Sequence, residues 1–211
     1  MYYIGIDCGM AGYISVLDDC GRLVEMHKAP LVKVEDQAIK HWYDTSKLIE
    51  IFKMYQPSNV VIEMQQVMSG QGLVTSGTVM RGFGLYEGII SCLYPYSYRI
   101  VKAVNWQNYL AKKYLKDLNI HFKPKTKNLE LIQELILDDK YKKWYTKFCN
   151  NKTTALSKIR SAFIYYKVME NLGLLSSLDV IKYTNNNAID GFLISKYCYD
   201  TISSVPQKLI I

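Results

Sequence analysis

The stretch Tyr2–Leu17, YYIGIDCGMAGYISVL, decides how the rest of the chain is organised. It opens with an apolar segment that predicts a buried strand, and this strand ends at one acid, Asp7. Gly9 and Gly12 then indicate a tight turn, and Tyr13–Leu17 predicts a second apolar strand. A carboxylate at the end of a buried strand is costly unless it has a partner, and converging carboxylates can share a hard divalent cation. What this stretch does therefore depends on which other acids can reach Asp7.

The composition is that of a globular protein with unevenly distributed charge. The 211 residues are 49% hydrophobic and 21% charged, which fits one domain with a sizeable core. The net charge is +7, yet residues 111–160 carry 13 lysines and arginines against 5 acids. A basic segment beside a near-neutral body favours a polyanionic partner such as nucleic acid. A solvated, lysine-rich helical face is the alternative.

Membrane insertion and secretion are not expected. No uncharged apolar run is long enough to cross a bilayer, and the first predicted strand begins at residue 2, which predicts a soluble intracellular chain without signal or transit peptide. The five cysteines are scattered and form no C-x-x-C pair, which favours free buried thiols in a reducing compartment over a zinc site. The sequence does not distinguish a bacterial, phage or viral cytosol from a nucleoid or organelle.

Hydrophobic periodicity predicts the element order βββ-α-β-α-β-α…α, an α/β fold. Short turns predict three antiparallel strands, and two later, parallel strands complete a mixed five-stranded sheet flanked by helices. We expect one domain over 1–211, with a basic helical insertion at about 113–156. A polar connection follows Pro30, and an uncharged, glycine-rich loop covers Met64–Gly77. The predicted strands are Tyr2–Asp7, Tyr13–Leu17, Arg22–His27, Asn59–Glu63 and Ser97–Val101, and the predicted helices are Thr45–Tyr55, Thr78–Leu93, one opening at Val104–Leu110, Ser157–Leu172 and Asn186–Asp200.

Three acids stand at the ends of predicted elements. Asp7 closes the first strand, Glu63 closes the fourth, and Asp190 lies in the first turns of the last helix. If the first and fourth strands are parallel neighbours, Asp7 and Glu63 emerge side by side, and a helix packed over that edge brings in Asp190. Three such carboxylates repel one another, which Mg²⁺ or Mn²⁺ relieves, and two ions can activate water for phosphodiester hydrolysis. The alternative is three unrelated acids: a turn cap, a salt-bridged glutamate and an acid at a helix N-terminus.

Five blocks of sequence follow one another: IGIDCGMAGYISVLD at Ile4–Asp18, VVIEMQQVMSGQG at Val60–Gly72, GFGLYEGII at Gly82–Ile90, VKAVNWQNYL at Val101–Leu110 and NNNAIDGFLISKY at Asn185–Tyr197. Together they resemble RuvC-type Holliday junction resolvases of the RNase H-like superfamily, most closely the phage, viral and organellar forms. The resemblance covers most of residues 1–112 and 157–200 and implies an RNase H-like fold. It also implies that an Asp on the first strand, a Glu on the fourth and an acidic pair on the last helix hold two metal ions. Those roles map to Asp7, Glu63 and Asp190.

One position departs from the family pattern. The family usually carries Asp, Glu or His three residues before the final acid, where this chain has Asn187. Asn187 shares a helical face with Asp190, and its amide oxygen can ligate Mg²⁺ without contributing charge. Asn186 and Asp179 are alternative ligands. A site weakened enough to bind junctions without cutting them is the other alternative.

The resemblance further implies contacts with DNA. In the family the loop after Glu63 meets the branch point, where Val67 and Met68 are the available apolar wedges. The segments HFKPKTK at His121–Lys127 and KYKKWYTK at Lys140–Lys147 interleave cations with aromatics, which can track phosphates and stack on bases. A flexible loop, ordinary surface cations and buried anchoring aromatics are the alternatives. The predicted DNA-binding residues are Gln65, Gln66, Val67, Met68, Gln71, Arg81, Arg99, Lys102, Lys123, Lys125 and Lys127.

The leading hypothesis is a structure-selective endonuclease, of the crossover junction endodeoxyribonuclease type, that resolves four-way DNA junctions by symmetric nicks. It would use two Mg²⁺ ions per active site, with Mn²⁺ as a substitute, and act as a homodimer, which the glycine-rich helix around Gly82–Gly88 also fits. A non-catalytic junction-binding protein is the second hypothesis, motivated by Asn187. Actin-like ATPases and sugar kinases share the opening strand, Asp and glycine hairpin, but they need a pair of such domains and a longer chain.

Overall fold

The computed structural model describes residues 1–35, 41–67, 70, 72–115, 156–174 and 186–203. The chain divides into two compact units, Met1–Trp106 with Asp190–Ile211, and Gln107–Ile189. The expectation of one domain over 1–211 stays a prediction, and most of the insertion expected at 113–156 lies outside the described residues. Within the described part of the chain, no helix is long and apolar enough to cross a membrane.

The first unit is built on a mixed five-stranded sheet of order β3-β2-β1-β6-β7. β1 pairs antiparallel with β2, and β2 pairs antiparallel with β3, whereas β6 is parallel to both β1 and β7. The α/β class and this arrangement of strands are as the sequence predicts. The strands are β1 (Tyr2–Ile6), β2 (Tyr13–Leu17), β3 (Leu23–Lys28), β6 (Ser58–Glu63) and β7 (Tyr98–Val101).

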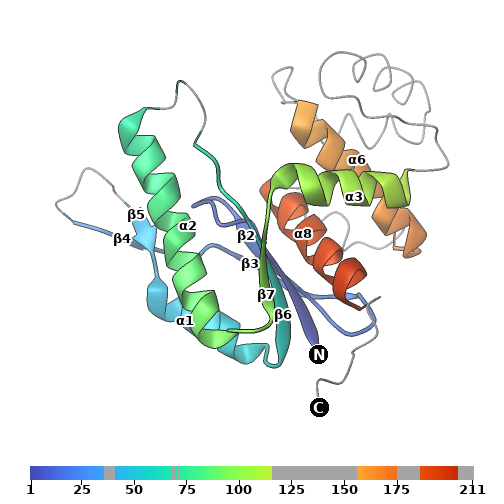
Figure 1. Cartoon of the computed structure of the whole chain (residues 1–211), viewed down its shortest axis with the longest axis horizontal. Helices are drawn as coiled ribbons and strands as arrows, with labels where there is room; N and C mark the ends of the chain where they lie inside the picture. The colour runs from blue at the N-terminus through green and yellow to red at the C-terminus, as the bar shows by residue number, and fades with distance from the viewer. Residues whose placement is uncertain (36–40, 68–69, 71, 116–155, 175–185, 204–211) are drawn as a thin grey trace. The chain divides into compact units, whose positions relative to one another are not determined.

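One face of the sheet packs against α1 (Thr45–Met54) and α2 (Leu73–Leu93), which Figure 1 shows on the same side of the strands. Side chains alternate between the two faces of a strand, so the even-numbered residues of β1, β2 and β6 meet these helices. They form an apolar core with residues of α1 and α2. Its fully buried members include Ile4, Ile6, Ile14, Val16, Leu48, Phe52, Val60, Ile62, Tyr86 and Ile90.

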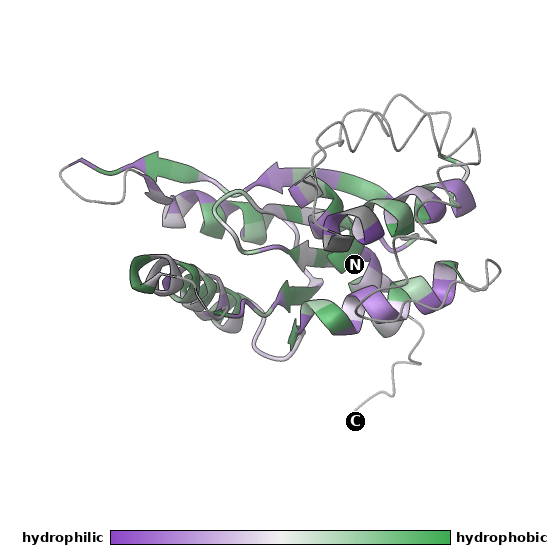
Figure 2. Cartoon of the chain, turned by 90° about the horizontal axis from the view of Figure 1, so that it is seen from above, coloured by the Kyte–Doolittle hydropathy of each residue, from purple (hydrophilic) through white to green (hydrophobic). Residues whose placement is uncertain are grey.

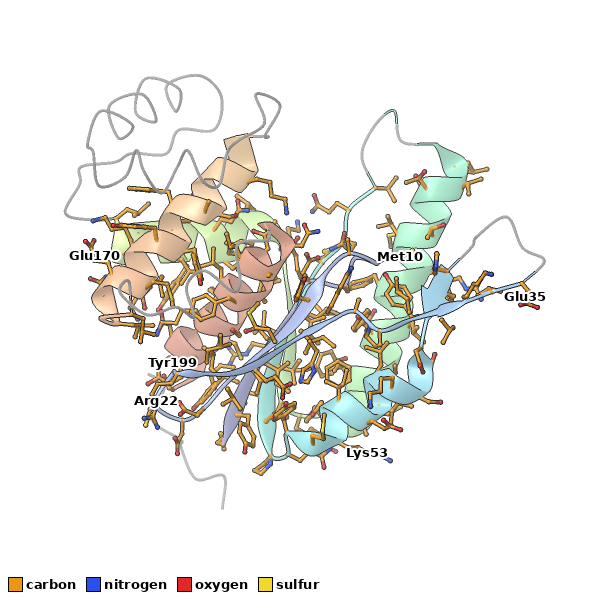
Figure 3. The ribbon with its side chains drawn as sticks, turned by 180° about the vertical axis from the view of Figure 1, so that it is seen from behind. Met10, Arg22, Glu35, Lys53, Glu170 and Tyr199 are labelled. Atoms are coloured by element: carbon orange, nitrogen blue, oxygen red, sulfur yellow. The ribbon has the colours of Figure 1, made fainter. Side chains whose placement is uncertain are left out.

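The opposite face carries α8 (Asn186–Ile202), whose residues from Asp190 onward belong to the first unit. The backbone of α8 lies close to the backbone of β1: a Cβ added to Gly5 would lie only 2.0 Å from the backbone nitrogen of Ser195. Ser195 Oγ also donates a hydrogen bond to Ser15 Oγ at 3.0 Å. Toward the far end, the rings of Tyr3 and Tyr199 meet edge to face at 5.1 Å. α8 therefore runs antiparallel to β1, and Figure 3 shows Tyr199 at the end of the sheet away from Met10.

Two local expectations for the first unit are wrong. The segment after Pro30 is not only a polar connection, since β4 (Leu31–Lys33) and β5 (His41–Tyr43) pair as an antiparallel hairpin. Each strand has only three residues, so its alternation is too short to stand out from a loop. The glycine-rich loop ends early, because α2 begins at Leu73 rather than Thr78. The first turn of α2 is exposed, so it lacks the apolar periodicity that signals a helix.

The second unit contains α6 (Leu156–Asn171), the larger part of α3 (Ala103–Tyr114) and the first turn of α8. Six consecutive residues of α6, 161–166, are buried, and a run of this length covers every side of the helix. Arg160 on α6 donates a hydrogen bond of 2.7 Å to Asn108 on α3, which ties the two helices together. The free cysteines are also divided: Cys8 and Cys198 are buried, while Cys20 and Cys92 are exposed, contrary to expectation.

Candidate active site

Asp7 and Glu63 emerge from neighbouring parallel strands at the same edge of the sheet. The register pairs Gly5 with Val61 and Ile6 with Ile62, so Asp7 and Glu63 stand at the next level. Because Gly5 faces α8 and side chains alternate along a strand, Asp7 also points to the α8 face. On β6, Val61 pairs with Gly5 and therefore also faces α8. Glu63, two residues later, points to the same face. Both acids are partly buried, which leaves them accessible from solvent while the strands below them are covered.

Asp190 approaches this edge from the N-terminal half of α8. Its neighbour Gly191 packs on Tyr13, because a Cβ on Gly191 would lie 3.0 Å from the carbonyl oxygen of Tyr13. The same oxygen accepts a hydrogen bond of 3.0 Å from the backbone N–H of Asp7. Asp190 itself is 7% exposed. These contacts place the segment around Asp190 at the same edge and on the same face of the sheet as Asp7 and Glu63; that the three acids form one site stays a prediction.

A tight turn orders the backbone directly after Asp7. Gly9 N–H donates to Asp7 Oδ1 at 3.3 Å, and Gly12 N–H donates to the carbonyl oxygen of Gly9 at 2.8 Å. Any Cβ at Gly12 would lie 2.0 Å from the carbonyl oxygen of Asp7, so the chain can fold back here only with glycine. The turn thus holds one oxygen of the Asp7 carboxylate by a backbone N–H.

Glu63 is held by its neighbours on two sides. Trp106, in the first turn of α3, donates a hydrogen bond of 2.7 Å from its indole N–H to Glu63 Oε2. Trp106 is 1% exposed. The thiol of Cys8 lies 3.4 Å from the carbonyl oxygen of Glu63 and donates to it. Burial, together with the neighbouring Asp7 carboxylate, raises the pKa of the Cys8 thiol.

Asn187 lies one helical turn before Asp190 in α8, within the second unit. Its Oδ1 accepts a hydrogen bond of 3.3 Å from Lys158 Nζ of α6. The oxygen expected to ligate an ion thus already has a cationic partner. Whether Asn187 is a metal ligand stays a prediction. Asn186 begins α8, while Asp179, the other alternative, lies outside the described residues.

The carboxylate oxygens of Asp7, Glu63 and Asp190 do not all lie within 4.8 Å of one another. Within the described ranges, the one group of three His, Cys, Asp or Glu side chains with ligand atoms all within 4.8 Å is Asp18, Asp19 and Cys20. Asp18 is already used by its own turn, since Oδ1 accepts from the backbone N–H of Cys20 and Arg22, and Oδ2 pairs with Arg22 Nε at 3.0 Å. A wider spacing suits the predicted site, because two ions about 3.5–4 Å apart need carboxylates on opposite sides of the pair. Three oxygen-donating carboxylates are also the ligand type that Mg²⁺ prefers.

The sequence matches no protein-family model and shows no significant similarity to curated protein sequences.

The expected DNA contacts fall into two groups. Gln66 and Val67 are exposed on the segment after β6, and Gln65 is partly exposed. Arg81, Arg99 and Lys102 are exposed; Arg81 stacks over the ring of Trp42 at 4.5 Å, and Lys102 follows β7 at the edge where Glu63 emerges. The remaining five residues lie outside the described residues: Met68, Gln71, Lys123, Lys125 and Lys127.

Two exposed apolar side chains near this loop, Leu73 and Val74, were not predicted as contacts from the sequence. Leu73 and Val74, in the first turn of α2, are 89% and 73% exposed, and Val67 is 49% exposed. Figure 2 shows α2 nearly end-on at lower left, with green and pale residues and few hydrophilic ones. The signal in the sequence is the uncharged run from Met64 to Met80, of which Met64–Gly77 was predicted as a loop. Leu73 and Val74 are adjacent in the chain, and neighbouring exposed apolar side chains mark a site of interaction.

Proposed function

We propose that this protein is a metal-dependent, structure-selective DNA endonuclease with an RNase H-like fold that cleaves four-way junctions. The observation that carries the proposal is the parallel register of β1 and β6, which sets Asp7 and Glu63 side by side facing α8. Asp190 supplies the third carboxylate. It directly precedes Gly191, where α8 packs against Tyr13 of the sheet. The five blocks that resemble RuvC-type resolvases carry these three acids, which supports the family assignment.

The donor set fits divalent cations. Asp7, Glu63 and Asp190 would hold Mg²⁺ or Mn²⁺, with Asn187 as a neutral candidate ligand. When bound, two such ions supply an activated water and stabilise the charge on the leaving oxygen of a phosphodiester. The residues of the chain do the rest: the Gly9–Gly12 turn orients Asp7, Trp106 holds Glu63, and Lys102 offers a cation for a phosphate at the same edge.

The exposed apolar patch of Val67, Leu73 and Val74 supports a branched rather than a linear substrate. Apolar side chains gain from stacking against bases only where the bases are unstacked, as at a junction centre. Arg81 is held on the same helix by its stacking on Trp42, which fits a contact to phosphate. Linear duplex offers this patch no unstacked bases, so we expect cleavage of junctions to exceed cleavage of duplex.

A homodimer would place two such sites on opposing strands and explain symmetric nicks. The exposed face of α2 fits this role, because a Cβ at Gly84 or at Gly88 would meet nothing within 4 Å. The sedimentation coefficient of the purified protein checks the assembly. A monomer that nicks both strands of a junction in one binding event would contradict the dimer.

The deciding experiment compares a mobile four-way junction with linear duplex and flap substrates, in the presence of Mg²⁺ or Mn²⁺. We expect paired nicks in the junction only, and Asp7→Asn should abolish cleavage while leaving junction binding measurable. Asp19→Asn, at an exposed acid of the β2–β3 turn, is the matched control and should cleave normally. Full activity of Asp7→Asn would remove Asp7 from the site and overturn the assignment.

The Lys158–Asn187 contact favours one other function, a junction-binding protein without cleavage. A cation at a position that the family gives to an acid weakens the attraction for metal ions. Tight junction binding with no nicked product at any concentration of Mn²⁺ would select this alternative over the endonuclease.

A further inference from the structure

We propose that Trp106 is a positioning residue for Glu63: its indole N–H fixes one oxygen of the carboxylate before any ion binds. This inference rests on the proposed function, since it assigns a role within the same carboxylate site. It concerns a residue that neither charge nor chemistry marks as part of a nuclease site. The role would be to hold the ligand, not to touch substrate.

The fold delivers Trp106 to Glu63 through three short steps. Glu63 pairs with Val101 across β6 and β7, and the N–H of Met64 donates to the carbonyl oxygen of Val101 at 2.7 Å. The chain then turns at Lys102, whose carbonyl oxygen accepts from the N–H of Asn105 at 2.9 Å as α3 begins. Trp106 is the fourth residue of α3, so its ring returns to the strand end that its chain has just left.

The hydrogen bond is of the strong type. At 2.7 Å the indole N–H to Glu63 Oε2 distance lies at the short end for an N–H donor, as expected for an ionised acceptor. A buried indole N–H needs an acceptor, and a free glutamate side chain samples many rotamers. The hydrogen bond therefore gives the indole N–H an acceptor and gives the Glu63 carboxylate a fixed partner. The bond restricts Glu63 in advance, so less conformational freedom is lost when an ion is bound.

The surroundings of the bond favour the same role. Trp106 is 1% exposed, so its ring excludes water from one side of Glu63. Partners that hold a ligating side chain, and the apolar shell around them, typically change metal affinity or activity by about 10–100-fold when they are mutated. Trp106 combines both features in one side chain.

The test measures Mn²⁺ binding by calorimetry in the full chain, with Trp106→Phe as the variant that keeps an aromatic ring and loses the donor. We expect about 10-fold or more weaker Mn²⁺ binding, in line with the effect of other partners of ligating side chains. Trp42→Phe is the matched control, because Trp42 stacks on Arg81 and should leave Mn²⁺ affinity unchanged. In a Glu63→Gln background, Trp106→Phe should have no further effect, since the coupled pair is already broken.

A second measurement leaves Trp106 in place and so does not depend on the folding of the variant. The indole N–H resonance of Trp106, assigned by elimination with Trp42→Phe and Trp144→Phe, should shift when Mg²⁺ is added. Glu63→Gln should abolish that shift. Two results would overturn this inference alone, provided that the wild-type protein binds Mn²⁺. The first is that Trp106→Phe binds Mn²⁺ equally well, and the second is that Mg²⁺ does not shift the Trp106 resonance. A wild-type protein that binds no metal and nicks no junction would overturn the proposed function and this inference together.

Discussion

Lys158 Nζ on α6 donates a hydrogen bond of 3.3 Å to Asn187 Oδ1, one helical turn before Asp190 in α8. A lysine therefore engages the amide oxygen at the position where the proposed family carries an acid or a histidine. The Lys158 ammonium adds a positive charge beside a residue that itself carries none. It makes residue 187 the most informative position for separating cleavage from binding.

Asn187→Asp should add a negative charge at this position. The new carboxylate would pair with Lys158, and since both groups are partly exposed we expect a gain in stability of at most about 1 kcal/mol. If residue 187 belongs to the metal site, the Mg²⁺ concentration for half-maximal cleavage should fall about tenfold, which corresponds to ~1.4 kcal/mol. A Mg²⁺ titration of cleavage measures this, with Asn187→Ala as the uncharged control. An unchanged Mg²⁺ requirement would place residue 187 outside the site.

Gly5→Ala should displace α8 from the sheet. The added Cβ would lie 2.0 Å from the backbone nitrogen of Ser195, so one of the two backbones must shift, and we expect a loss of stability of at least about 1–3 kcal/mol. Gly84→Ala is the matched control on α2, where the Cβ meets open space, and it should be neutral or stabilising by up to about 1 kcal/mol. Urea denaturation measures both. Equal stabilities would mean that α8 does not pack at Gly5.

Leu73→Ser combined with Val74→Ser should weaken junction binding without weakening the fold. Both side chains are largely exposed, so little apolar burial is lost on substitution, and we expect thermal stability to be unchanged. Loss of two contacts to unstacked bases should lower junction affinity about tenfold, or ~1.4 kcal/mol. Met54→Ser, at a 56% exposed methionine on α1, is the control and should bind as wild type. Unaltered junction affinity in the double variant would exclude this patch as the DNA contact.

His27 should make stability depend on pH. Its Nε2–H donates to Tyr55 Oη at 2.9 Å, and the Tyr55 hydroxyl donates to Glu25 Oε2 at 2.7 Å. Burial lowers the pKa of His27; the nearby Glu25 carboxylate opposes this effect, and Lys47 adds to it. The folded state thus prefers the neutral ring. The neutral His27 ring contributes fully to the stability of the fold above the unfolded pKa of about 6.5. This stabilisation is lost as the pH falls through the lower pKa of the folded state.

The measurement is the melting temperature from pH 8 to pH 5 for wild type and His27→Gln. The melting temperature of His27→Gln should fall less at acidic pH than that of the wild type, because residue 27 no longer titrates. His41→Gln, at an exposed histidine of β5, should keep the wild-type profile. Parallel profiles for wild type and His27→Gln would show that another group causes the acid sensitivity.

Several features of the fold followed from local sequence patterns. The five strands of the main sheet were predicted within one or two residues, because buried strands leave runs of apolar, β-branched side chains between clear turn residues. The placement of Asp7 and Glu63 at a shared edge also followed, since parallel strands with acids at their carboxyl ends can meet only there. The β4–β5 hairpin was missed because three-residue strands carry no readable alternation.

What the sequence alone determined is the identity of the carboxylates and the strands that carry them, since period-two patterning and chain order need no distant contact. Tertiary packing decided the rest. Gly5 meets Ser195 some 190 positions away, which fixes the face that receives Asp190. The bond from Trp106 to Glu63 depends on how β7 turns into α3, and that of Lys158 to Asn187 on how two helices pack. No local pattern encodes these contacts, because each arises only when segments distant in the chain are brought within hydrogen-bonding distance.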